Sequence, residues 1–325
     1  MDINLRKKAP GLRAVADIRL ATHEDGPGRG QRILIARNAT GVAFDVAVDR
    51  GFDISCLSIG GINIGWHSSV QTRFPASDPG SEEGWGFLRN FDGFMVTCGL
   101  DHISRPLEVD ICHHSHPQFK TKTMPLHGRI ATERARLVGY GVNTETGDVF
   151  CEAVVRQASV FGETLELHRR ITLPVFRSVL TIDDTVTNRG FRPARDAILY
   201  HLNYGYPFLD ENLEVSGLPE TLLADMRVGP PMPWDDYGER VSTVESSQIP
   251  ETEPIVLANP ELEVSVGMTY SHSHLTRLAV WRAYQSGVFA LGLEPRTEPA
   301  EDRPLLQAGK RCAHSFQLVL DNQRR

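Results

Sequence analysis

The sequence contains few cysteines, and their spacing argues against the usual structural roles of this residue. There are five, an odd number, and none belongs to a C-x-x-C pair. They are Cys56, Cys98, Cys112, Cys151 and Cys312. This pattern argues against a disulfide framework and against a structural zinc site. We therefore expect reduced thiols in a cytoplasmic protein.

The sequence also lacks a long apolar run and a basic tract. No run approaches the length of a membrane span, and residues 1–12 do not have the continuous apolar stretch of a signal peptide. The formal net charge is −7, and the early basic cluster, Arg6-Lys7-Lys8, is short. We expect neither a membrane nor a nucleic acid as a partner.

No stretch of the chain has a long helical period. Short apolar or alternating runs are separated instead by turn residues, which is typical of strands. Strands are predicted over residues 32–36, 42–48, 53–59, 94–98, 149–157, 163–173, 178–187, 194–202, 255–257, 261–268, 276–283, 288–293 and 312–320. Closely spaced strands without intervening helices predict an all-β fold, a large antiparallel β-sandwich. The unpatterned segments 71–90, 113–124 and 219–253 are expected to form a rim over a binding face or to have no fixed structure.

The most informative segment is 200–207, Tyr-His-Leu-Asn-Tyr-Gly-Tyr-Pro, which follows the apolar run 197–199. It predicts His201 near the end of a strand, among three phenol rings. Aromatic faces stack on the C–H surfaces of sugars, and imidazole titrates near neutrality. The combination favours a proton donor to a sugar ring oxygen. The alternative is a hydrogen-bonded histidine of the core.

Two other segments supply partners for His201. One is the turn Pro125-Leu126-His127-Gly128, and the other is Gly292-Leu293-Glu294-Pro295. His127 could instead only shape its turn, since histidine tolerates unusual backbone angles. Glu294 could instead be a surface ion-pair partner of Arg296.

Four motifs, in order along the chain, carry a resemblance to a known superfamily. They are Leu126-His127-Gly128, Val186-Thr187-Asn188-Arg189-Gly190, Tyr200-His201-Leu202-Asn203-Tyr204 and Leu293-Glu294-Pro295. The sequence resembles the aldose 1-epimerase (galactose mutarotase-like) superfamily over most of its length. Residues 49–54, Asp-Arg-Gly-Phe-Asp-Ile, and 97–101, Thr-Cys-Gly-Leu-Asp, resemble more closely a branch named only as a domain of unknown function. The resemblance implies a single antiparallel supersandwich domain over residues 1–325.

The resemblance also implies roles for individual residues. His201 matches the general acid of the superfamily, Glu294 its general base, and His127 the histidine that helps to hold the sugar near its ring oxygen. Arg89 loosely matches the substrate-binding arginine that precedes the Leu-His-Gly turn, and its alternative role is a structural ion pair. The implied reaction is an isomerisation in carbohydrate metabolism, the exchange of the anomers of a free sugar or sugar derivative by ring opening and closure, with no metal and no cofactor.

Three further residues are expected to line the sugar pocket. Asp101 and His102 follow a strand that begins just after Arg89, and Tyr204 is one of the phenols near His201. Their carboxylate, imidazole and hydroxyl groups can hydrogen-bond to sugar hydroxyls.

The sequence leaves the identity of the sugar open. It lacks the Gly-Tyr-Asp-His segment of the better-known mutarotases, and neither Asp225 nor Asp235 stands in an equivalent context. A phosphate or sulfonate would need converging cations. Candidates are Arg89, Arg105, Lys120, Lys122 and Arg129.

Two other motifs leave alternatives open. Residues 112–116, Cys-His-His-Ser-His, could bind a metal ion or form a solvated loop, and residues 117–121 contain no glutamate of the kind that a cupin places after its second histidine. Residues 49–53 could contact sugar hydroxyls or form an ion-paired hairpin.

Three hypotheses for the function follow. The first is the isomerase just described. The second is a non-catalytic carbohydrate-binding protein of the same fold, which needs no acid and base. The third is a glycoside hydrolase or lyase, which needs a second catalytic group such as Glu298, Asp101 or Tyr204.

Overall fold

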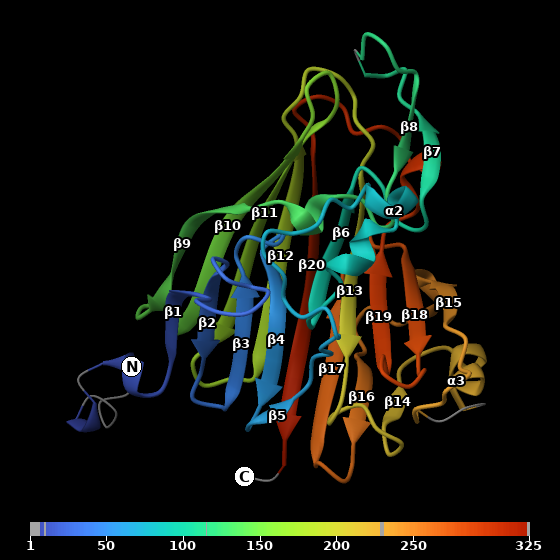
Figure 1. The fold of residues 1–325 in the computed structure, drawn as a ribbon. Coiled ribbons are helices and arrows are strands. Elements are labelled where there is room, and N and C mark those ends of the chain that lie inside the picture. Colours follow the sequence, from blue (N-terminus) through green and yellow to red (C-terminus); the bar gives the residue numbers. More distant parts are fainter. Residues whose placement is uncertain (1–6, 10, 115, 228–230, 324–325) are drawn as a thin grey trace.

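The computed structural model describes residues 7–9, 11–114, 116–227 and 231–323. Most of the basic N-terminal segment, residues 1–6 and 10, lies outside this description, as does Ser115 of the 112–116 motif. Two large antiparallel sheets pack face to face and make up most of the molecule (Figure 1). The prediction of a large antiparallel β-sandwich is therefore confirmed.

The first sheet has ten strands and the second has eight. In spatial order, the first sheet consists of β1 (Asp17–Thr22), β2 (Arg32–Arg37), β3 (Val42–Ala47), β4 (Asp53–Ile59), β6 (Met95–Leu100), β13 (Ala197–Tyr204), β19 (Ala290–Arg296), β18 (Arg277–Ala283) and β15 (Arg240–Glu245), with β5 (Ile62–Asn63) paired to β4. The second consists of β14 (Glu214–Ser216), β16 (Ile255–Asn259), β17 (Val264–Tyr270), β20 (Arg311–Asn322), β12 (Val179–Asn188), β11 (Thr164–Pro174), β10 (Asp148–Ala158) and β9 (Ala135–Asn143). Strands β7 (Leu107–Asp110) and β8 (Thr121–Met124) form a separate ribbon.

Helices are short and lie in the connections. They are α2 (Ser81–Gly84), α3 (Glu220–Arg227) and the 3₁₀ turns η1 (Leu12–Ala14), η2 (Gly86–Arg89), η3 (Ile130–Thr132), η4 (Ser246–Gln248) and η5 (Ala300–Asp302). Among the described residues, none of the helices is long and apolar enough to cross a membrane.

Every range predicted as a strand overlaps an observed strand, with bounds that differ by up to three residues, but several strands were not predicted. Strand β9 contains two glycines, which weaken its pattern. Strand β15 and helix α3 lie inside the unpatterned segment 219–253. Strand β15 lies at the edge of the sheet and none of its residues is fully buried. Its sequence therefore does not alternate clearly between apolar and polar residues.

Strand β13 has two different faces because its side chains alternate across the sheet. Ile198, Tyr200, Leu202 and Tyr204 point into the core between the sheets, where they join one large apolar cluster. Leu199 belongs to a second, smaller cluster on the other side of the first sheet. His201, two residues further along, shares that outer face.

A buried charged cluster connects the two sheets beneath strands β6 and β13; we call it the Arg169 cluster. The guanidinium of Arg169 donates to both carboxylate oxygens of Asp184, at 2.9 and 2.6 Å, and to the hydroxyl oxygen of Thr97 at 2.8 Å. The Thr97 hydroxyl donates to Asp53 at 2.6 Å, and the Tyr200 hydroxyl donates to Asp184 at 2.7 Å. Buried charges need such pairing, because an unpaired ion in the interior is strongly destabilising.

The segment 49–53 therefore serves the fold. Asp49 forms an ion pair with Arg32 at 2.6 Å, as the ion-paired alternative predicted. Buried Arg50 donates to the main-chain oxygen of Asp92 at 2.6 Å, and Asp53 belongs to the Arg169 cluster. None of the side chains of 49–53 lines the large cavity described below.

We predict that Arg169→Met lowers the free energy of unfolding by about 3–5 kcal/mol, because it leaves Asp184 and Asp53 buried without their cation. The neighbouring Arg170 is the matched control. It points to the other face of β11 and pairs with Glu152 in a partly exposed site. Arg170→Met should cost less than about 1 kcal/mol. Urea unfolding of the two variants measures the difference, and equal losses would contradict this account.

Candidate active site

A cavity of about 620 Å³ opens on the outer face of the first sheet. Its floor comes from β13, β19 and β18, and its walls come from residues 66–70, 85–91, 104–105, 126–127, 239–243 and 285–288. Segments 71–90 and 219–253 thus contribute Trp85, Phe87, Leu88, Val241 and other groups to the walls. The expectation that these long connections form a rim agrees with this arrangement.

The side chains of His201 and Glu294 meet at the floor of this cavity. The register that aligns Leu199 with Arg296 and Leu202 with Leu293 places His201 directly opposite Glu294 on the neighbouring strand. Cross-strand neighbours have Cβ atoms about 5 Å apart, so the two side chains can touch. The distance from His201 Nε2 to Glu294 Oε1 is 3.3 Å, and both side chains are almost fully buried, at 4% and 6% exposure.

Aromatic rings surround His201, but they are not the predicted ones. Phe91 and Trp281 stand edge to face against the imidazole, with ring centroids 4.8 and 5.1 Å away. The expectation of a phenol setting was wrong, because strand alternation sends Tyr200 and Tyr204 into the core.

His127 stands at one end of the cavity in a backbone conformation with φ of 57°. Its Nδ1 accepts a hydrogen bond from the main-chain N–H of Ser104 at 3.3 Å. The neutral ring therefore carries its proton on Nε2, which remains a donor. Burial, followed by the neighbouring His201, holds the pKa of His127 well below its usual value, so the ring is neutral at pH 7.

Two glycines next to the site residues stand where an added side chain would meet a close neighbour. A side chain at Gly128, where φ is 74°, would collide with the main-chain oxygens of Gly99 and His102. At Gly292 on β19, an added Cβ would lie 3.0 Å from Cε1 of His201 and 3.2 Å from the ring of Trp281. The Leu-His-Gly and Gly-Leu-Glu motifs thus each have a steric reason for glycine.

The protonation of His201 depends on two opposing effects. Burial lowers the pKa of the imidazole below its usual value, and the carboxylate of Glu294 partly offsets this by favouring the charged form. Both side chains carry groups that can exchange a proton with a bound ligand.

Four of the seven predicted site residues do not reach the cavity. Arg89 points to solvent and pairs with Glu82 at 2.8 Å. Asp101 is buried and forms an ion pair with Arg129 at 3.5 Å. His102 is buried and its Nε2–H donates to the main-chain oxygen of Arg105 at 2.8 Å. Tyr204 packs in the core against Phe94. The structure thus places these four side chains outside the cavity, contrary to the expectation that they line it.

Sequence reasoning missed several cavity residues. Trp66 and Trp281 lie in segments without a chemical motif, and Phe91 was not recognised as a partner of His201. Arg296 was considered only as a partner of Glu294, yet it is two residues further along a strand, and period-two alternation alone puts it on the same face.

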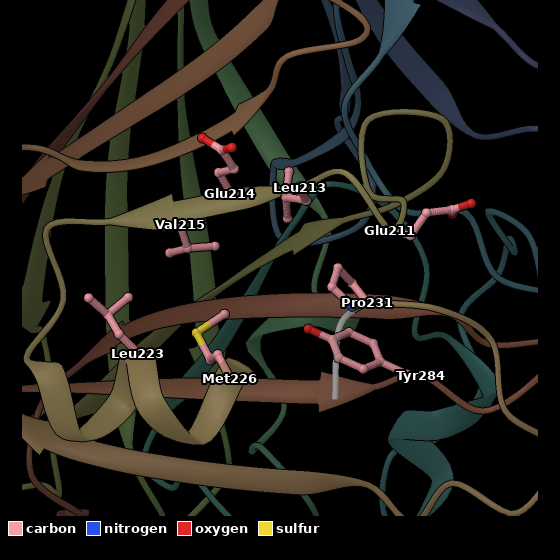
Figure 2. Close-up of a pocket in the computed structure, with 8 residues that line it drawn as sticks. All are labelled: Glu211, Leu213, Glu214, Val215, Leu223, Met226, Pro231 and Tyr284. Carbon is pink, nitrogen blue, oxygen red and sulfur yellow. The ribbon is translucent and has the colours of Figure 1, made fainter. Parts of the chain in front are cut away.

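A second cavity, of about 460 Å³, lies between β14 and α3 (Figure 2). Leu213, Val215, Leu223 and Met226 supply its apolar walls, together with Tyr284 (Figure 2). It contains none of the predicted site residues and no histidine. We place the candidate site in the larger cavity, because its floor holds His201 in contact with Glu294 and its walls carry aromatic surfaces.

The histidines of residues 112–116 do not gather around a common point with other ligands. His113 and His114 stack at a ring distance of 4.2 Å, and burial lowers the pKa of His113 to about 4. Within the described residues, no group of three or more His, Cys, Asp or Glu side chains is arranged to hold a metal ion.

This fold is that of the galactose mutarotase-like class of proteins. A candidate aldose 1-epimerase from Klebsiella pneumoniae has a TM-score of 0.79 and 19% identity, over 93% of this chain and 83% of that one. A galactose mutarotase-like protein from Clostridium acetobutylicum has a TM-score of 0.68 and 11% identity, over 96% and 100%. Galactose 1-epimerase from Lactobacillus acidophilus has a TM-score of 0.53 and 13% identity, over 94% and 98%.

The chain belongs to the family described as a domain of unknown function, DUF4432, whose model matches residues 28–313. No curated protein matches the sequence. The resemblance expected from the motifs, to a poorly characterised branch of the mutarotase superfamily, is confirmed.

We predict that Gly292→Ala displaces the imidazole of His201 and lowers the activity of the site by about 10²-fold, the effect of a displacement near 1 Å. Gly139→Ala on β9 is the matched control, since its added Cβ would meet only Phe150 at an ordinary 3.7 Å. Circular dichroism establishes that both variants fold. Unchanged activity in Gly292→Ala would argue against a tight fit around His201.

We predict that His201 titrates below pH 6.5, because burial disfavours its charged form. Glu294→Gln removes the carboxylate that favours the imidazolium, so the pKa of His201 should fall further in that variant. Histidine ring resonances followed by NMR across a pH series measure both values. A pKa that rises in Glu294→Gln would show that the carboxylate does not act on this ring.

Proposed function

We propose that the protein is a mutarotase that interconverts the anomers of a free sugar or sugar derivative. The single observation that carries the proposal is the contact between His201 Nε2 and Glu294 Oε1, 3.3 Å apart on the floor of an aromatic cavity. The hydroxyl oxygen and the ring oxygen of an anomeric centre are bound to the same carbon. An acid and a base that act on both oxygens must therefore lie close together.

In the proposed ring opening, Glu294 takes the proton from the anomeric hydroxyl. The electron pair of that O–H bond forms the C1 carbonyl, the bond from C1 to the ring oxygen breaks, and the ring oxygen takes a proton from Nε2 of His201. Rotation about the C1–C2 bond presents the other face of the aldehyde. Closure reverses both proton transfers, so the reaction needs no net proton, electron or water.

The other lining groups have supporting roles in this proposal. Trp66, Phe91 and Trp281 offer aromatic faces to the C–H surfaces of a sugar. The Nε2–H of neutral His127 donates to an oxygen near the ring, since its Nδ1 is occupied by Ser104. A protein that only binds sugar needs these contacts but not a cross-strand acid and base.

The hydrolase alternative has weaker support. Of the groups named for it, Asp101 and Tyr204 are buried away from the cavity, and Glu298 pairs with Arg277 at 2.5 Å. The carboxylate that does line the cavity with Glu294 is Glu239, which accepts a hydrogen bond from the indole N–H of Trp281 at 3.2 Å.

The test is anomer exchange, recorded by saturation-transfer NMR on neutral and acidic sugars at anomeric equilibrium. We expect the wild type to accelerate exchange for at least one sugar. His201→Asn and Glu294→Gln should each slow it by about 10²–10⁴-fold, the usual contribution of a general acid or base.

Arg89→Met is the matched control, because this surface side chain pairs with Glu82 outside the cavity. A folded wild type that binds a sugar without accelerating exchange would favour the binding-protein alternative. Cleavage of a simple glycoside would favour the hydrolase instead.

A further inference from the structure

Arg296, in the wall of the cavity, has the charges of Glu294 and Glu298 nearby but is in contact with neither carboxylate. It lies two residues after Glu294 on β19, partly buried, and its Nε is buried with no acceptor. Its guanidinium forms no hydrogen bond and no ion pair with any residue that the structure describes. Glu294 does not take this role, because its Oε1 is turned towards His201 at 3.3 Å.

Other buried arginines of this protein have acceptors. Arg50 donates to the main-chain oxygen of Asp92, Arg169 to Asp184, and Arg282 to Asp225. Burying a guanidinium without an acceptor is unfavourable, so the exception at Arg296 calls for a partner that the chain does not supply.

Arg296 lies near the end of the cavity where His127 stands. Its charge is among those that lower the pKa of His127, after burial and two nearby histidines. Arg105 belongs to the same end, because the preceding Ser104 donates to Nδ1 of His127. His102 fixes this loop by donating to the main-chain oxygen of Arg105. Arg105 lines the cavity at its exposed rim, and its guanidinium has no partner among the described residues.

Two guanidinium groups without a hydrogen-bonded partner and the Nε2–H of His127 thus line the same cavity, Arg296 within electrostatic reach of His127 and Arg105 one residue after its hydrogen-bond donor. Guanidinium forms two parallel hydrogen bonds with a carboxylate, sulfonate or phosphate and is the side chain most suited to such groups. The carboxylates that line the cavity are both engaged, Glu294 with His201 and Glu239 with Trp281.

We propose that this end of the cavity binds an anionic group of the sugar, and that the substrate is an aldose with a carboxylate, sulfonate or phosphate on the exocyclic carbon beside its ring oxygen. The inference rests on the proposed function for the orientation of the sugar. In the proposed orientation, His201 contacts the ring oxygen and Glu294 contacts the anomeric hydroxyl. The ring oxygen joins the anomeric carbon to the ring carbon that bears the exocyclic group. A substituent that reaches His127 is therefore attached to this second ring carbon. The rings of His127 and His201 are 5.8 Å apart, within reach of such a substituent.

Binding tests the inference separately from catalysis. At anomeric equilibrium a mutarotase does not change the composition of the sugar solution, so calorimetric titration reports affinity alone. The probes are glucose and galactose, their 6-carboxylates (glucuronate and galacturonate), their 6-phosphates, and 6-deoxy-6-sulfoglucose. The three acidic groups distinguish the possible sources of the anion. We expect at least one acidic sugar to bind about tenfold to a hundredfold more tightly than its neutral parent, the worth of hydrogen bonds to a charged group.

Arg296→Met should abolish this preference and leave the affinity for the neutral parent unchanged. Arg296→Lys should recover part of it, since lysine keeps the charge without the bidentate geometry. Arg105→Met, at the exposed rim, provides a second variant with little risk to folding and should weaken acidic sugars only. Arg89→Met should keep the full preference.

Several results would overturn the inference. They are equal binding of neutral and acidic sugars, no binding of any probe, or an equal loss for both classes in Arg296→Met. The last result would mean that Arg296 supports the binding of every sugar and does not recognise an anionic group. A preference for acidic sugars without anomer exchange would instead retain the anion site and remove the mutarotase proposal.

Discussion

The ion pair between Arg169 and Asp184 is the constraint on which the rest of the structure depends. It joins the second sheet to β4, β6 and β13 of the first through Asp53, Thr97 and Tyr200. Tyr200 and His201 are neighbours on β13 and point to opposite faces of the sheet. Tyr200 anchors the strand to the Arg169 cluster, while His201 faces the cavity. The interior polar network thus fixes the floor on which the chemistry takes place.

The acid and the base of the proposed reaction are positioned by strand register and not by loops. His201 and Glu294 face each other across two paired strands, and a one-residue slip would send either side chain into the core. Many of the groups in the walls of the cavity come from connections, including residues 66–70 and 85–91. A fold of this kind can alter its ligand by changing connections while the paired strands keep the same reactive groups.

Local signals predicted the fold class, and the motifs of the family resemblance singled out His201 and Glu294, which the structure brings into contact. Alternation marks most strands, and His201 and Glu294 belong to motifs. Local signals did not predict where four other side chains point, because the direction of a side chain depends on which face of its element is buried. These are Arg89, Asp101, His102 and Tyr204. Tyr204 illustrates the point, because it follows His201 by three residues and so lies on the opposite face. Trp66, Phe91 and Trp281 reach the cavity only through tertiary folding, and no spacing in the sequence indicates their meeting.

Three of the four tryptophans of the chain, Trp66, Trp85 and Trp281, line the large cavity. The near-ultraviolet emission of the whole protein therefore originates mostly from one place. Any molecule that displaces water from these indoles alters their surroundings directly. Binding in the cavity can therefore be followed by the intrinsic tryptophan fluorescence of the protein, without an attached dye.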